Sequence, residues 1–193
     1  MSPIFWVSFG LLWILVVIQG LAFLELLRQV GQLRKQVGPQ QGVLIMQGAV
    51  KAGAPLPQLF GLSARNLHPA RWEDYLDAHF SVVVLLSTHC ITCRAIAEDL
   101  TRLAADVSEE AAIIVIVEGK IDEVQAFIAK TQLNLRIVII DEEGETAKQL
   151  NVLWNPAAIT VRGRKLGEAA VINDIDQLNA LVRAEEANHA ISR

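Results

Sequence analysis

The stretch SVVVLLSTHCITCRAIAEDL, residues 81–100, decides the fold. Its first part, residues 81–86, is a short run of apolar and β-branched residues, which is typical of a strand buried on both faces. Apolar residues then recur at spacings of three and four across residues 93–107, which predicts one buried face of a helix. Cys90 and Cys93, the only two cysteines in the chain, lie where the strand gives way to the helix.

The alternation of strands and helices continues to the end of the chain. The expected elements are strands at 81–86, 111–117 and 136–141, helices at 93–107, 122–133 and 145–152, two strands about a turn at 162–165, and a closing helix at 175–191. Buried strands alternating with helices predict an α/β fold with a parallel or mixed sheet covered by helices. The last two strands follow each other closely, which predicts an antiparallel edge.

Near the N-terminus, residues 4–24 (IFWVSFGLLWILVVIQGLAFL) carry no charged side chain. As a helix this run spans about 30 Å, the thickness of a hydrocarbon core. A cleaved signal peptide is the alternative, but the run lacks a basic n-region, is too long and is not followed by an A-x-A-like site. We therefore expect an N-terminal transmembrane helix that is retained as a single-pass anchor.

The rest of the chain divides by composition. An apolar seam over residues 25–37 extends the anchor as a juxtamembrane helix, which the Gly38-Pro39 pair ends. The anchor and this helix thus take up residues 1–37. Residues 38–51 form a linker with a short predicted strand at 43–46, and residues 52–193 form one domain with its own core.

Charge is distributed unevenly along the chain. Residues 1–50 hold three of the 17 Lys and Arg and one of the 21 Asp and Glu, so the remainder has a net charge of −6. This acidic balance argues against nucleic acid as a partner, since phosphate binding needs a basic surface. The basic residues after the anchor point the domain toward the cytoplasm by the positive-inside rule, whereas disulfide chemistry points to the oxidising side of the membrane.

The placement of the two cysteines predicts a redox dithiol. Unpaired N–H groups and the helix dipole favour a thiolate at Cys90, and Cys93 follows one turn later, so the sulfurs can bridge with little backbone movement. Arg94 adds a positive charge, and His89 directly precedes the first cysteine. In thiol–disulfide exchange Cys90 would attack a partner disulfide and Cys93 would resolve the mixed species, without a cofactor.

Three other interpretations of the pair stay open. A zinc site needs a second CxxC or a spaced pair of histidines, which His68, His79 and His189 do not provide, so we expect no metal. The second is a pair of inert core cysteines, against which the strand-to-helix placement argues. The third is a dithiol that has lost its activity and is retained as part of the fold.

A proline completes the pattern. Pro156 in VLWNPAAITV directly precedes an apolar strand, and read alone it is most often a trans turn proline. Together with the AGAPLP entry at 52–57 and the CxxC in its βα setting, it makes residues 52–191 resemble a thioredoxin-fold domain. With the apolar N-terminal run added, the chain resembles the membrane-anchored TlpA-like family, and within that family the MauD type.

The resemblance implies a thioredoxin-like fold, in which a mixed central sheet of four or five strands is flanked by helices. It implies that Cys90 is the nucleophile, that Cys93 is the resolving thiol, and that their redox-active disulfide is the only reactive group, with no cofactor. MauD-type members are linked to disulfide formation or isomerisation in a periplasmic methylamine dehydrogenase subunit. Following this resemblance, we expect the domain on the extracytoplasmic side of the cell membrane.

The resemblance also implies a substrate groove beside the disulfide. A cis peptide between Asn155 and Pro156 would pack against the disulfide to shape it, and His89 and Thr92 are its further candidate residues. The Asn155 amide would either hydrogen-bond an incoming peptide or simply tolerate an irregular backbone.

This chain departs from thioredoxin-like proteins at four places. The dipeptide between the cysteines is Ile91-Thr92 without a proline, His89 replaces an aromatic residue, and Val84 occupies the place of a buried acid. Asn155 precedes the proline, where the family commonly has Thr, Val or Ile. Because Val84 cannot relay a proton, exchange would be slow or would use water or His89. His89 is otherwise a solvent-facing loop residue without a role.

Two functions from different classes follow. The first is an anchored thiol–disulfide oxidoreductase whose partners are a client protein with cysteines and a membrane redox partner that recharges the dithiol. The second is a non-catalytic thioredoxin-like subunit docked in a larger membrane complex. The intact Cys90, Cys93 and Pro156 favour the oxidoreductase, whereas Val84 in place of a buried acid favours the non-catalytic subunit.

Overall fold

The computed structural model describes Trp6, Phe9 and residues 12–21, 44–45, 52–59, 61–76, 80–107, 111–152 and 154–191. It divides the chain into two units, residues 1–41 and 42–193. In the first unit residues 12–21 are helical, and the large apolar side chains among them are exposed. Within the described part of the chain, no helix has both the length and the apolar character needed to cross a membrane. The juxtamembrane helix expected at 25–37 lies outside the described residues.

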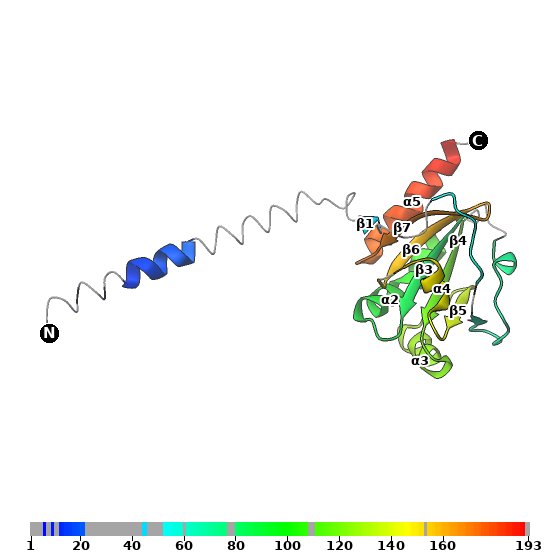
Figure 1. Cartoon of the computed structure of the whole chain (residues 1–193), viewed down its shortest axis with the longest axis horizontal. Helices are drawn as coiled ribbons and strands as arrows, with labels where there is room; N and C mark the ends of the chain where they lie inside the picture. Colours follow the sequence, from blue (N-terminus) through cyan, green and yellow to red (C-terminus); the bar gives the residue numbers. More distant parts are fainter. Residues whose placement is uncertain are drawn as a thin grey trace. The chain divides into compact units, whose positions relative to one another are not determined.

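A mixed sheet of seven strands forms the centre of the second unit (Figure 1). In spatial order the strands are β1 (Leu44–Ile45), β7 (Lys165–Val171), β6 (Ala157–Arg162), β3 (Phe80–Ser87), β4 (Ala111–Glu118), β5 (Val138–Asp141) and β2 (Leu62–Ser63). The three strands β3, β4 and β5 run parallel, and the other pairs are antiparallel. Between β6 and β7 the chain turns at Gly163 (φ 50°) and Arg164 (φ 67°), the positive dihedrals that a type I′ hairpin requires.

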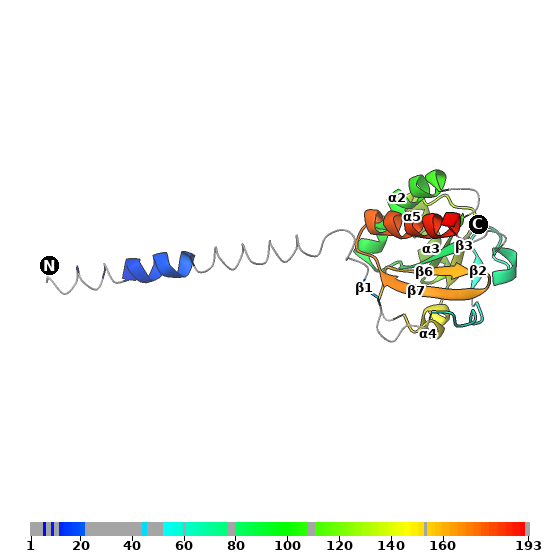
Figure 2. The same ribbon diagram turned by 90° about the horizontal axis from the view of Figure 1, so that it is seen from above.

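Helices cover both faces of this sheet (Figure 2). On one face lie α2 (Ile91–Asp106), α3 (Ile121–Thr131) and α5 (Ile175–Ile191). On the other lie α4 (Glu145–Gln149) and the short 3-10 helix η1 (Trp72–Asp74). The parallel strands require crossover connections, and α2 and α3 supply them on the same face.

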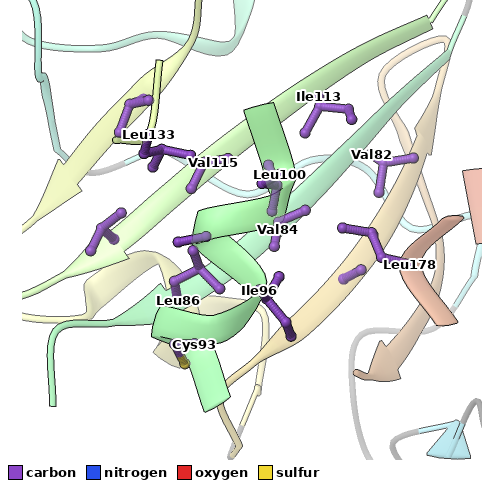
Figure 3. Packing of buried hydrophobic residues seen from close by; sticks show 14 of the residues in the cluster. Val82, Val84, Leu86, Cys93, Ile96, Leu100, Ile113, Val115, Leu133 and Leu178 are labelled. Carbon is purple, nitrogen blue, oxygen red and sulfur yellow. The ribbon is translucent and has the colours of Figure 1, made fainter. Parts of the chain in front are cut away.

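The central place of β3 in the sheet explains why residues 82–86 are apolar without alternation. Val84 packs into the core under α2, whereas Leu85, the next residue, packs into the core on the side of α4. Figure 3 shows Ile96 and Leu100 of α2 in the first of these cores. A strand that is covered on both faces has no side for polar residues, so the continuous apolar run follows from its central place.

The elements expected over residues 81–191 are all present, with small shifts at their ends. The expected helix at 145–152 ends at Gln149, because Asn151 takes a left-handed φ of 49°. The predicted antiparallel pair, β6 and β7, is present. It is not confined to the edge of the sheet, because β6 also pairs with β3 near the middle. The implied count of four or five strands is too low, because two-residue strands extend both sides of the sheet. One of them, β2, lies in a segment whose composition carries no periodic signal.

Truncating Leu100 tests whether α2 is held by this core. Its side chain is fully buried (0% exposed), so Leu100→Ala should lower the free energy of unfolding by about 2–5 kcal/mol. Urea unfolding of the full chain in detergent micelles measures this, with the exposed Glu98→Ala on the same helix as the matched control. Equal losses in the two variants would contradict the packing described here.

Candidate active site

Cys90 and Cys93 form a disulfide at the N-terminus of α2, with their Cα atoms 5.2 Å apart. β3 ends at Ser87, and the Cys90 N–H donates to the Ser87 carbonyl at 3.2 Å, which closes the turn into the helix. The side chain of Cys93 lies in the core with that of Ile96 (Figure 3) and is fully buried (0% exposed). Cys90 is partly exposed. An external thiolate therefore reaches the sulfur of Cys90 more readily than that of Cys93.

The helix start surrounds Cys90 with hydrogen-bond donors. Cys90 is the N-cap residue of α2, and its Sγ accepts a hydrogen bond from the Cys93 N–H at 3.0 Å. The first turn of the helix holds no acidic residue that would compete for these donors. A thiolate at this place gains more from the donors and from the helix dipole than a thiol does, which suits Cys90 to nucleophilic attack.

A second segment meets the disulfide from β6. Because β6 runs antiparallel to β3, with Ala157 opposite Leu85, the residues just before β6 lie where β3 ends. The peptide bond between Asn155 and Pro156 is cis, as the resemblance implied. The Asn155 carbonyl oxygen lies 3.7 Å from Cys90 Sγ. The sheet thus brings together two candidate site residues that are 65 positions apart in sequence.

A third participant, Glu118, was not predicted from the sequence. It is the last residue of β4, and its Oε2 accepts a hydrogen bond from Asn155 Nδ2 at 3.1 Å. Its backbone carbonyl accepts the Thr88 N–H at 3.1 Å, two residues before Cys90. One signal was available: Glu118 ends a parallel strand adjacent to β3, and functional side chains gather at the carboxyl ends of such strands.

The remaining candidates lie around the disulfide in different environments. His89 is exposed, and its Nδ1 lies 2.9 Å from Thr88 Oγ1, with which it shares a hydrogen bond. Thr92 is exposed on the outer side of the helix start. Val84 is fully buried in the same apolar cluster as Cys93, so no carboxylate lies at that point of β3.

Two cationic side chains line a hollow of about 270 Å³ between the start of α2 and α3. They are Arg94 and Lys130, and His89 and Glu123 also line it. Glu123 accepts a hydrogen bond from the Lys120 N–H at 3.3 Å, so its carboxylate is engaged at the start of α3. This side of the dithiol therefore carries more positive than negative side chains.

Two large apolar side chains that adjoin the site residues in sequence are exposed to solvent. Ile91, which follows Cys90, is 85% exposed, and Trp154, which precedes Asn155, is 68% exposed. Among the described residues from 52 to 191, Leu67 is the other large apolar side chain that is exposed. Exposed apolar side chains that gather at one place indicate a surface that binds another molecule.

Among the residues that the structure describes, no group of three or more His, Cys, Asp or Glu side chains is arranged to hold a metal ion. The nearby carboxylate of Asp141 is engaged, because it accepts the N–H groups of Glu145 and Thr146 at 3.0 and 2.8 Å and so caps α4.

Known proteins share this fold. Residues 52–172 match the AhpC/TSA family. A secreted disulfide oxidoreductase of Mycobacterium tuberculosis, homologous to DsbE of E. coli, is 23% identical with a TM-score of 0.54, covering 66% of this chain and 96% of its own. The thioredoxin domain of a thiol-disulfide oxidoreductase from Bacteroides vulgatus is 12% identical with a TM-score of 0.60, covering 70% and 98%.

A DsbF homologue from Corynebacterium diphtheriae is 18% identical with a TM-score of 0.57, covering 71% of this chain and 90% of its own. No curated protein matches this chain. At these identities the solved structures show the fold alone. They establish a thioredoxin-like α/β domain of the kind that thiol-disulfide oxidoreductases use, and in this chain it carries the Cys90–Cys93 pair.

The different burial of the two sulfurs should make their reactivities unequal. After reduction, Cys90 in Cys93→Ser should react with iodoacetamide at least about 10-fold faster than Cys93 does in Cys90→Ser, because burial withholds Cys93 from the reagent. Mass spectrometry of the full chain in micelles at pH 7 follows both reactions.

Each variant retains a single cysteine, so no other thiol of the chain contributes to the signal. In urea the two rates should approach each other, because unfolding exposes Cys93. Equal rates without urea would contradict the assignment of Cys90 as the reachable sulfur.

Proposed function

The chain belongs to the AhpC/TSA family, and we propose that it is a membrane-anchored thiol–disulfide oxidoreductase that acts on a client protein outside the cytoplasm. The observation that carries this proposal is the disulfide at the start of α2, with Cys90 within reach of solvent and Cys93 buried behind it. This difference in exposure suits an attacking and a resolving sulfur, because the attacking sulfur must contact the client and the resolving sulfur must not.

The chemistry proceeds by two exchanges and needs no bound cofactor. When the chain acts as reductant, the Cys90 thiolate attacks a client disulfide, and one client sulfur leaves as a thiolate that takes a proton from water. Cys93 then loses its proton to solvent and attacks Cys90 Sγ, which releases the second client thiolate and forms the Cys90–Cys93 disulfide. In the opposite direction a client thiolate attacks Cys90, and the same bonds form and break in reverse order.

The client docks on the apolar surface beside Cys90. Ile91 and Trp154 stand on the two segments that meet at the Cys90 sulfur, the start of α2 and the residues before β6. Burial of a large apolar side chain against a partner contributes about 1.5–3 kcal/mol to the binding free energy. This favours the complex in which a client cysteine lies beside the dithiol. We therefore infer a client whose reacting cysteine has apolar residues beside it.

The anchor places this activity at a membrane. The uncharged run at 4–24 and the exposed apolar side chains of the helical residues 12–21 support an anchored chain, because such side chains gain most from a lipid environment. The resemblance to the MauD type supports an extracytoplasmic domain with a maturation role for a disulfide-containing client. A second membrane protein that exchanges electrons with Cys90–Cys93 would complete the cycle.

Disulfide exchange with a peptide tests the proposal. The full chain in micelles should exchange disulfides with a cysteine peptide that carries apolar neighbours, and Cys90→Ser should abolish the reaction. Trp154→Ala should slow exchange with the peptide by about 10-fold, because one apolar contact is lost, and leave reduction by 2-mercaptoethanol unchanged.

Leu67→Ala is the matched control, since Leu67 is also exposed (43%) but belongs to the segment that follows β2. It should leave both reactions unchanged. A rate of disulfide exchange no higher than that between free peptides would contradict the proposed oxidoreductase activity and favour a non-catalytic docking subunit.

Labelling of intact cells tests the anchor and its side. After mild reduction, a membrane-impermeant maleimide should label Cys90 of the membrane-bound Cys93→Ser chain without lysis, because the domain is proposed to face outward. Labelling that appears only after lysis would place the domain in the cytoplasm. Release of the chain from membranes by carbonate at high pH would contradict the transmembrane anchor.

A further inference from the structure

The end of β3 is the point where the reactive residues meet. In the sheet β3 lies between β4 and β6, and its last residue, Ser87, pairs with Glu118 of β4. On the other side Leu85 pairs with Ala157, so Asn155 lies two positions further, beside the same end of β3. The hydrogen bond from Asn155 Nδ2 to Glu118 Oε2, 3.1 Å long, therefore links the end of β4 to the segment before β6, where the dithiol loop begins.

The position of the Glu118 carboxylate is determined on several sides. Its backbone carbonyl accepts the Thr88 N–H at 3.1 Å, which fixes the strand end against the dithiol loop. A Cβ placed on Gly144 would lie 3.1 Å from Glu118 Oε1, so the missing side chain at Gly144 leaves the room that this carboxylate occupies. Gly144 also has a φ of 65°, which favours glycine there.

Glu118 in turn determines how Asn155 is oriented. A carboxylate accepts hydrogen bonds only, so the Asn155 amide must turn its nitrogen toward Glu118. Its Oδ1 is then buried without a hydrogen-bond partner among the described residues. With the side chain held in this way, the Asn155 backbone carbonyl lies 3.7 Å from Cys90 Sγ.

Two sets of groups act on Cys90 in opposite directions once the disulfide is reduced. The Cys93 N–H and the helix dipole favour the thiolate. A carbonyl oxygen accepts a hydrogen bond from a thiol and offers nothing to a thiolate, and a nearby carboxylate repels the thiolate charge. The Asn155 carbonyl and Glu118 therefore both favour the protonated form.

We propose that Glu118 is a positioning residue that acts through Asn155 to hold Cys90 as a thiol until a client disulfide is present. This inference rests on the proposed oxidoreductase activity for its purpose, but its contacts are independent of any client. In the step itself the Cys90 thiol gives its proton to water, and the resulting thiolate attacks the client sulfur. A dithiol that is held back in this way reacts less with small oxidants between encounters with its client.

Other charged groups lie near this end of the sheet, among them Lys130 and Glu123 of α3, which have opposite charges and line the hollow next to Arg94. Arg94 and His89 lie on the helix and loop that carry Cys90, and a positive charge on either favours the thiolate. Asp141, on β5, pairs with Glu118 in the sheet, but its carboxylate is engaged by two N–H groups at the start of α4. This leaves Glu118 as the carboxylate that is linked to Cys90 by contacts that the structure describes.

The test is the pH dependence of Cys90 alkylation in the reduced full chain, in micelles and with Cys93→Ser as the background. Glu118→Gln keeps an acceptor for Asn155 Nδ2 and removes the charge, whereas Glu118→Ala removes both. The pH at which the alkylation rate is half-maximal should fall by about half a unit in Glu118→Gln and further in Glu118→Ala. Glu98→Gln, an exposed carboxylate on α2, is the matched control and should not shift it.

The route through Asn155 is tested by a double-mutant cycle. Asn155→Ala alone should also lower the midpoint, and the shift in Glu118→Ala combined with Asn155→Ala should be smaller than the sum of the single shifts. Additive shifts would overturn the route, and an unchanged midpoint in both Glu118 variants would overturn the inference.

A purely structural role of Glu118 predicts a different result. It would lower the urea midpoint of Glu118→Ala and change the alkylation rate equally at every pH, and this outcome also overturns the proposal. Alkylation needs no client, so it separates this inference from the proposed function. A chain that exchanges no client disulfide but shows the shifted midpoints would disprove only the function.

Discussion

The pairing of β3 with β4 on one side and β6 on the other is the constraint on which the rest of the structure depends. β3 runs parallel to β4 and antiparallel to β6, so the end of β4, the end of β3 and the start of β6 lie at one edge of the sheet. This edge collects Glu118, the dithiol loop and Asn155 from three distant parts of the sequence. A one-residue slip of β6 would turn its side chains to the opposite face and separate Asn155 from both partners.

The same arrangement produces a dithiol under two opposing influences. Burial of Cys93 and the N-cap position of Cys90 come from the helix that follows β3, and they favour attack by Cys90. The Asn155 carbonyl and the Glu118 carboxylate come from the flanking strands, and they favour its protonated form. No acid lies at Val84, and the carboxylate linked to the dithiol is instead that of Glu118, three positions beyond Val115, which pairs with Val84.

The surface beside the dithiol has an apolar part and a positively charged part. Ile91 and Trp154 offer apolar contact area on two sides of Cys90, while Arg94 and Lys130 give the hollow behind the helix start a positive character. Apolar contacts contribute affinity without strong directional demands, whereas charges select among partners. A client protein with an apolar residue near its cysteine would gain affinity from the apolar contacts.

The sequence by itself determined the α/β alternation, the place of the CxxC between strand and helix, and the apolar run at 4–24. These are local patterns of burial and spacing, so they are visible without knowledge of what lies beside them. Only the tertiary structure decided that Glu118 meets Asn155, that the segment carrying Trp154 meets Cys90, and that β2 adds a further strand to the sheet. The physical reason is that these features depend on the register between strands distant in sequence, and register is fixed by the packing of both sheet faces, not by any one segment.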